Sequence, residues 1–122
     1  MKKSLEHYIS ELLYLEDCII VPDFGGFIVN DSSATINKKS GEITPPSKTI
    51  LFNSQLFNND GLLVNHIAKE ENISHKECLA YVLSISKKLK SKLFETKILR
   101  IKKIGLFTIG SENNILFTQE KR

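Results

Sequence analysis

The chain contains few of the residues that mark specialised classes of protein. Among its 122 residues there is no tryptophan, one methionine, three prolines and two cysteines. Cys18 and Cys78 form no CxxC pair, so the sequence indicates neither a zinc cluster nor a disulfide framework. Each lies in an apolar stretch, and we expect both to be buried free thiols. A disulfide between them is compatible with the sequence, but nothing requires one.

Long apolar runs are also absent. None reaches the roughly 18 residues that cross a bilayer, and the basic residues 1–4 are followed by Glu6, His7 and Glu11 rather than by the apolar stretch of a signal peptide. We therefore expect a cytoplasmic protein without membrane contact in this segment, unless the chain is a piece of a longer protein. Its 41% hydrophobic and 25% charged residues are typical of globular domains.

Signatures of catalysis and of cofactor binding are missing as well. His7, His66 and His75 are scattered over helical stretches, where a solvent-facing histidine is the usual case, and no nucleophile–base order or phosphate loop appears. Residues 23–25 resemble the metal-binding tripeptide of kinases, but the companion motifs are absent. The sequence therefore predicts a non-enzymatic protein with no metal, no cofactor and no small-molecule substrate.

Charge is divided unevenly between the two halves. Residues 1–60 hold five basic and eight acidic side chains, a net charge of −3. Residues 61–122 hold twelve basic and six acidic side chains, a net charge of +6. Within the second half, eight basic residues stand close together: Lys87, Lys88, Lys90, Lys92, Lys97, Arg100, Lys102 and Lys103. Such a cluster either meets an anionic partner or is simply a solvated face.

Apolar side chains at helical spacing predict three helices. The first follows its N-cap, Ser4; Asn59 or Asp60 caps the second; and Ser74 with Glu77 forms a capping box for the third. Runs of strand-forming residues predict strands at 18–22, 27–30, 42–44, 49–52, 98–102, 106–109 and 115–118. A hairpin turn is expected near residues 40–41, and the two prolines at 45–46 should interrupt strand pairing.

A short pattern recurs at an offset of 80 residues. Gly25-Gly26-Phe27 in the first half matches Gly105-Leu106-Phe107 in the second, and an apolar strand leads into each. We expect the glycine to allow a tight turn or bulge and the phenylalanine to fill the core beneath it. The repeat predicts an α+β fold of two diverged helix-plus-hairpin units, 1–58 and 59–122, packed as an intrachain pseudo-dimer; exchange between chains to give a homodimer is the alternative.

The second half resembles the HU/IHF family of bacterial DNA-architectural proteins. The resemblance lies in residues 73–77, in the long helix 78–94 and in the turn 104–107, and residues 23–56 are similar to the arm-bearing half of that family. More closely, the whole chain resembles a bacterial family with two HU-like domains in tandem, related to eukaryotic centrosomal HU-domain proteins. The matching blocks are 17–27, 45–48 and 59–63.

The resemblance implies an HU-like binding function and, in longer relatives, a membrane span and a peptidoglycan-binding SPOR domain that suggest a nucleoid or cell-division role. The arm departs from the family, however, because HU arms are rich in basic residues and carry a proline wedge at the tip. Here Lys38 and Lys39 are the basic residues near the tip, and Asp31 would repel phosphate.

Two functions remain open. The first is sequence-independent DNA binding or tethering, with contacts from the helix residues 87–92 and from a basic strand face. The candidate nucleic-acid-binding residues are Lys38, Lys39, Lys48, Lys97, Arg100, Lys102 and Lys103. The alternative is a protein–protein interaction scaffold that has lost DNA binding, which the weakened arm and the acidic first half favour.

Overall fold

The structure is a computed structural model that describes residues 2–32, 34–58 and 60–120. The helices and strands lie in the order α1 (Leu5–Leu15), β1 (Cys18–Val21), β2 (Gly25–Ser32), β3 (Thr35–Ile36), β4 (Ile43–Thr44), β5 (Ser47–Asn53), α2 (Leu62–Glu71), α3 (His75–Thr96), β6 (Ile98–Ile101), β7 (Gly105–Ile109), the short 3-10 helix η1 (Ser111–Asn113) and β8 (Ile115–Gln119). The predicted α+β class is therefore confirmed. No helix within the described ranges is both long and apolar enough to cross a bilayer.

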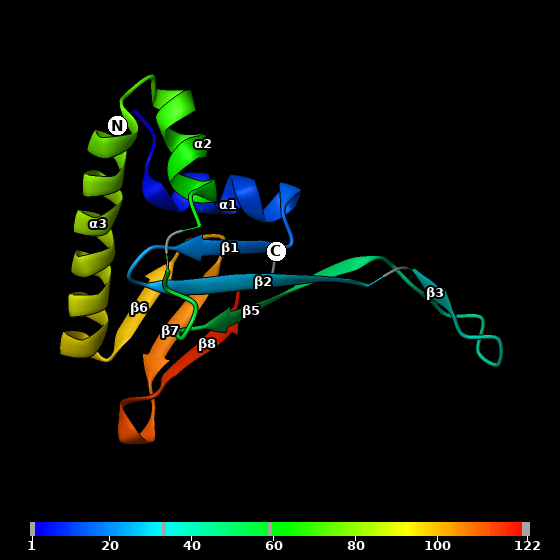
Figure 1. Ribbon diagram of the computed structural model, residues 1–122. Helices are drawn as coiled ribbons and strands as arrows, with labels where there is room; N and C mark the ends of the chain where they lie inside the picture. The colour runs from blue at the N-terminus through cyan, green and yellow to red at the C-terminus, as the bar shows by residue number, and fades with distance from the viewer. Residues whose placement is uncertain (1, 33, 59, 121–122) are drawn as a thin grey trace.

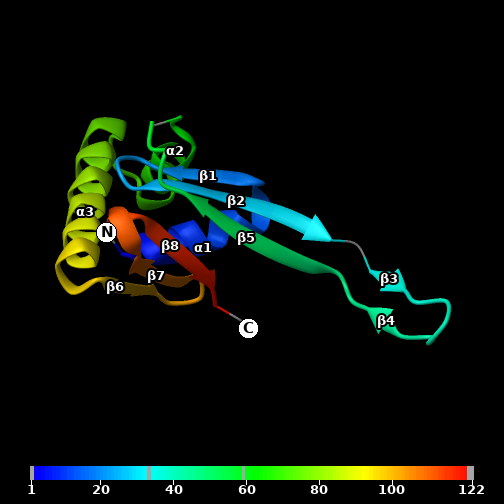
Figure 2. The same cartoon turned by 90° about the horizontal axis from the view of Figure 1, so that it is seen from below.

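The strands form two antiparallel three-stranded sheets and a small outlying ribbon. The first sheet has the order β1-β2-β5 and the second β6-β7-β8, while β3 and β4 pair only with each other. Figures 1 and 2 show that β2 and β5 continue past the body of the protein into the β3–β4 ribbon, so that together they make an arm pointing away from α3. Figure 1 places α1 and α2 on the same side of the first sheet.

Capping side chains fix where the helices begin. The hydroxyl of Ser4 accepts a hydrogen bond from the His7 amide at 3.2 Å, and that of Ser74 accepts one from the Glu77 amide at 3.1 Å, as the sequence predicts. At α2 the N-cap is Gly61, and the carboxylate of Asp60 accepts from the first-turn Leu62 amide. Asn59, the other predicted cap, lies outside the described residues.

The turn between the first two strands is built in the same way in both units. Its left-handed residue is Asp23 (φ 67°) in the first copy and Lys103 (φ 71°) in the second. In each copy the next amide, that of Phe24 or Ile104, donates to a carbonyl three residues earlier at 3.0 Å. The backbone of residues 17–29 is thus repeated at 97–109, since the amide of the fifth residue of the second strand, Val29 or Ile109, also donates to the carbonyl of residue 17 or 97.

The glycines also serve a purpose that the sequence did not predict. The left-handed turn residues are Asp23 and Lys103, while Gly25 has a φ of 158°, an angle that residues with a side chain rarely adopt. A Cβ on Gly25 would lie 2.3 Å from the Phe52 ring, and one on Gly105 would lie 2.5 Å from the ring of Phe117. Glycine is required here because a phenylalanine from the neighbouring strand lies directly on the backbone.

These phenylalanines join the two sheets into one core. Phe107 is fully buried, and its ring centroid lies 4.8 Å from that of Phe117, 4.9 Å from Phe52, 5.4 Å from Phe24 and 6.1 Å from Phe27. Rings from both units therefore meet edge to face or tilted, the arrangements that aromatic pairs favour. A shared core of this kind is what the pseudo-dimer prediction requires.

The two cysteines have different surroundings. Cys78 is buried, as predicted, and burial raises the pKa of its thiol, so it behaves as an inert packing residue. The prediction for Cys18 is wrong, because this residue is exposed. In β1 the alternation places Ile19 and Val21 inward, which leaves Cys18 on the outer face of the sheet.

Candidate functional site

The arm ends in a tight loop that carries two lysines. The side-chain oxygen of Asn37 accepts hydrogen bonds from the amides of Lys39 and Ser40, which holds the loop closed behind the ribbon. Directly before and after this loop, Ile36 pairs with Ile43 across the strands, and the two side chains are 67% and 69% exposed. The outer arm therefore presents an unburied apolar pair beside Lys38 and Lys39.

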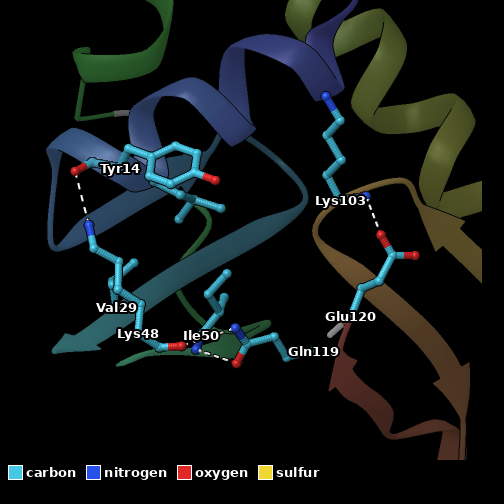
Figure 3. Close-up of a pocket in the computed structure, with 8 residues that line it drawn as sticks. Tyr14, Val29, Lys48, Ile50, Lys103, Gln119 and Glu120 are labelled. Atoms are coloured by element: carbon cyan, nitrogen blue, oxygen red, sulfur yellow. Dashed lines mark hydrogen bonds between the residues drawn. The ribbon is translucent and has the colours of Figure 1, made fainter. Parts of the chain in front are cut away.

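A cleft of about 570 Å³ lies where the two units meet, between the end of α1, strand β5 and strand β8. Figure 3 shows Lys48 on one side of this cleft and Lys103 on the other, with Gln119 at the end of β8 and Glu120 directly after it. Its lining residues are Leu13, Tyr14, Val29, Lys48, Ile50, Lys103, Gln119 and Glu120. The floor is apolar and the rim is charged, which is an arrangement suited to a protein segment.

One side chain joins the edges of the two sheets at this cleft. The amide of Gln119 donates to the Lys48 carbonyl at 3.1 Å and accepts from the Ile50 amide at 2.9 Å (Figure 3). Because both groups lie on the free edge of β5, the glutamine occupies positions that another strand would otherwise fill. The two units are thus fastened by hydrogen bonds as well as by the aromatic core.

Two predicted DNA-binding residues are already engaged within the protein. The Lys48 ammonium donates to the Tyr14 carbonyl at 3.0 Å and lies 5.6 Å from the centre of the Tyr14 ring. The Arg100 guanidinium forms an ion pair with Glu120, with Nε 2.9 Å from Oε1, and this pairing lowers the pKa of the Glu120 carboxyl. Glu120 also accepts from the Lys103 amide, so it holds the turn of the second unit in place.

The lysines of α3 are different, because none has an ion-pair partner among the described residues. Lys87, Lys88 and Lys92 line one exposed face of the helix together with Glu95. Three hydroxyl residues share that face: Ser84, Ser91 and Thr96. We call the surface made by these seven residues the α3 lysine face. It combines three lysines with the hydroxyls of Ser84 and Ser91, whereas the Thr96 hydroxyl already donates within the chain, 2.8 Å from the Lys92 carbonyl.

The seven predicted nucleic-acid-binding residues do not form one surface. Lys38 and Lys39 are at the tip of the arm, and Lys97 caps the far end of α3. Lys102 and Lys103 lie beside the first turns of α1, and Arg100 is on the outer side of β6. The α3 lysine face, which sequence reasoning named only as the helix residues 87–92, is the denser group. Helical spacing was the signal that could have identified it, since residues three and four apart share a face.

A second cluster escaped the sequence analysis altogether. His7 and His66 were interpreted as scattered histidines, yet both lie beside the carboxylate of Glu11, and Glu70 is next to them. The hydrogen bond with His66 lowers the pKa of Glu11. The cluster joins α1 to α2. The sequence shows a histidine and a glutamate four residues apart on each helix, but it does not show that the helices meet, because the whole first sheet separates them along the chain.

Two helix-plus-hairpin copies that share one aromatic core, one of them extended into an arm, define a tandem HU-like protein. The comparison with family models agrees: the chain belongs to the family of CCDC81-like prokaryotic HU proteins, with residues 1–60 matching HU domain 1 and residues 61–122 matching HU domain 2. No curated protein and no solved structure matches the chain. At the level of the family, HU domains are binding or architectural modules of the DNA-binding type rather than enzymes.

Proposed function

We propose that this protein binds duplex DNA without sequence preference. The observation that supports this most strongly is the α3 lysine face. Its three lysines form no ion pair among the described residues, and Glu95 is the one carboxylate among its seven residues. Lysine contacts to phosphate act independently of base sequence, and hydroxyl groups add hydrogen bonds to phosphate oxygens.

The arm supplies a second proposed contact. The exposed pair Ile36 and Ile43 stands on a two-stranded ribbon beside Lys38 and Lys39. Apolar side chains of this kind can lie in a minor groove while flanking lysines reach the phosphates. Lys97, Lys102 and Lys103 would add to the positive field, whereas Lys48 and Arg100 would contribute less because each is held within the protein. We propose a nucleoid or cell-division role for this binding, with the module as a tether.

The test is DNA binding across a salt series with a matched pair of charge variants. Lys88→Gln with Lys92→Gln alters the α3 lysine face, whereas Lys69→Gln with Lys76→Gln removes the same charge from exposed positions outside it. The first pair should lower affinity roughly tenfold and reduce the slope of log K against log salt by about 2. The control pair should change both far less. Absence of binding by the unaltered protein at the lowest salt would contradict the proposal.

A scaffold function is the second candidate, and the cleft between the units favours it. The buried side chains of Leu13, Val29 and Ile50 form the floor of this cleft between two lysines, Lys48 and Lys103. A photo-cross-linking residue placed at Lys48 should then yield a defined protein adduct in cells, whereas one placed at exposed Lys69 should not. Equal labelling from both positions, or none from Lys48, would count against a partner in the cleft.

A further inference from the structure

Two helices from different units bring the same short pattern together twice. On α1, His7 and Glu11 are four residues apart, and on α2 so are His66 and Glu70. Residues at this spacing share a helix face, so each helix presents an imidazole beside a carboxylate. The two faces meet, because His66 Nε2 lies 2.7 Å from Glu11 Oε1.

The donor atoms are close enough to share one ion. One ligand atom from each of Glu11, His66 and Glu70 can be chosen so that all lie within 4.8 Å of one another. Ligand atoms bound to zinc stand about 2 Å from the metal, which places them roughly 3–3.5 Å apart. Glu70 is exposed on α2, so its side chain has room to rotate toward the other two, and Glu11 would turn from His66, which now lies 2.7 Å away, to admit the ion.

The chemistry of the donors selects the class of metal. One imidazole nitrogen with two carboxylate oxygens is a set that zinc and its neighbours in the first transition row accept. Calcium and magnesium prefer sites made wholly of oxygen with six or more ligands, which this cluster does not offer. His7 adds an outer contact, since its Nε2 lies 3.4 Å from the second oxygen of Glu11 and so holds that carboxylate in place.

We propose that Glu11, His66 and Glu70 form a binding site for a divalent transition metal of the zinc type, with water as the fourth ligand. The site joins α1 of the first unit to α2 of the second. Bound metal would therefore clamp the two HU-like units together and stabilise the folded protein. This inference does not rest on DNA binding.

A simpler interpretation is that Glu11 and His66 form only an ion pair between the helices. The ion pair needs no third group, so Glu70 would be irrelevant to stability, and added zinc would have no saturable effect. The metal site predicts the opposite on both points. Metal dependence and the role of Glu70 therefore distinguish the two interpretations.

The experiment uses tag-free protein with Cys18→Ser, because that exposed thiol could bind zinc by itself. After removal of metal with EDTA, calorimetry with zinc chloride should show one ion per chain. Thermal unfolding should show Tm rising by about 5 °C at free zinc roughly tenfold above Kd. Magnesium should have no effect.

Two variants and one control distinguish the metal site from the ion pair. Glu70→Ala, at an exposed helix position, and His66→Ala should each abolish the zinc-dependent rise in Tm. His75→Ala, which removes an exposed histidine outside the cluster, should preserve it. The proposal is overturned if the Cys18→Ser protein binds no zinc saturably, or if Glu70→Ala retains the full response.

Discussion

The two units of this protein are alike inside and unlike outside. In both, a left-handed residue at the turn (Asp23 or Lys103) precedes a glycine on which a phenylalanine ring from the next strand rests. The strand register is also the same, with Phe27 opposite Ile19 in one copy and Phe107 opposite Leu99 in the other. At the contact between glycine and ring, one added carbon atom would clash with the phenylalanine.

The exposed parts differ in length and charge. The helix before the hairpin has 11 residues in the first unit and 22 in the second. The hairpin of the first unit runs on into an arm, whereas that of the second closes after five residues through the short helix η1. Lysines gather on the longer helix, so the divided charge of the sequence follows this division of shape.

The difference between the inner and outer parts shows which features of a repeated unit can differ between its copies. A ring packed on a glycine sets the distance between two strands, and altering it disturbs both sheets because the rings of the two units touch. Helix length and hairpin length alter only surface. We therefore expect the inner features of both copies to matter equally for stability and the outer features to separate their functions.

The largest expected effect comes from removing one core ring from each unit, which tests whether the two units contribute equally to stability. Phe27→Ala and Phe107→Ala each remove a fully buried ring from the common core, one from each unit. Each should lower the free energy of unfolding by about 3–5 kcal/mol. Chemical denaturation followed by circular dichroism measures this loss, and both variants should unfold in a single transition.

The double variant and a control complete this experiment. Because the two ring centroids are 6.1 Å apart, the double variant should lose less than the two single losses added together. Phe57→Ala, at a half-exposed side chain, should cost far less. Additive losses, or two separate transitions, would mean that the units have independent cores.

The glycines give the next largest effect, which should be similar in the two copies for different reasons. Gly105→Ala places a Cβ 2.5 Å from both the Phe117 ring and the Thr118 carbonyl oxygen, whereas Gly25→Ala meets the Phe52 ring but stays 3.2 Å from the nearest backbone atom. We expect losses of roughly 3 kcal/mol from each, since the ring at Gly25 can shift more readily than a strand but the φ of 158° there is one that alanine rarely adopts. Thermal unfolding measures both.

Gly110→Ala is the matched control for these substitutions. Its added Cβ would meet the side chain of Leu116, which is half-exposed and free to move. A loss as large as that of Gly105→Ala would show that the cost comes from the strand backbone in general rather than from the packed ring.

A smaller effect concerns the contact between α1 and α2. The buried phenol of Tyr8 donates to Glu71, which also accepts from the Lys2 amide, and these bonds lower the pKa of the Glu71 carboxyl. A carboxyl whose pKa is lowered by folding stabilises the protein at neutral pH, and this stabilisation is lost as pH falls below its ordinary value near 4.5.

Tyr8→Phe should therefore lower Tm by about 3 °C at pH 7 and less at pH 3. Thermal unfolding of both proteins at the two pH values measures the difference. Glu6→Gln, at a carboxyl on the same helix that has no such partner in any described hydrogen bond, is the control and should lower Tm at pH 7 by less than Tyr8→Phe does. An equal loss at both pH values would mean that packing of the ring, not the bond to Glu71, carries the effect.

Most of the fold could be predicted from the sequence because it depends on residues that are close together along the chain or on a motif that repeats. Ser4 and Ser74 mark helix starts, and the offset of 80 residues marks the repeat. The role of Gly25 could not be predicted, since it depends on Phe52, a residue far along the chain that pairs with the neighbouring strand. Cys18 was misjudged because a short apolar run does not say which strand face is covered.

The candidate site was less accessible to prediction. Charge counts located the basic half, but the engagement of Arg100 by Glu120 and of Lys48 by Tyr14 depends on tertiary contacts. Charge along a chain does not distinguish a free lysine from a bonded one. That distinction is what moves the proposed DNA contacts from the strand β6 to the α3 lysine face.

The smallest expected effect compares the buried faces of the two helices that precede the hairpins. On α1 the buried polar atom, the Tyr8 hydroxyl, is bonded, whereas on α3 the fully buried hydroxyl of Ser86 has no hydrogen-bond partner among the described residues. A buried donor without a partner costs free energy.

Ser86→Ala should therefore raise stability. Ser84→Ala, at an exposed position of the same helix, is the control and should gain only the higher helix propensity of alanine. We expect the difference between the two gains to be roughly 0.5–1 kcal/mol in chemical denaturation; a smaller gain at Ser86 than at Ser84 would mean that its hydroxyl is bonded in solution and that the two helices are equally well satisfied.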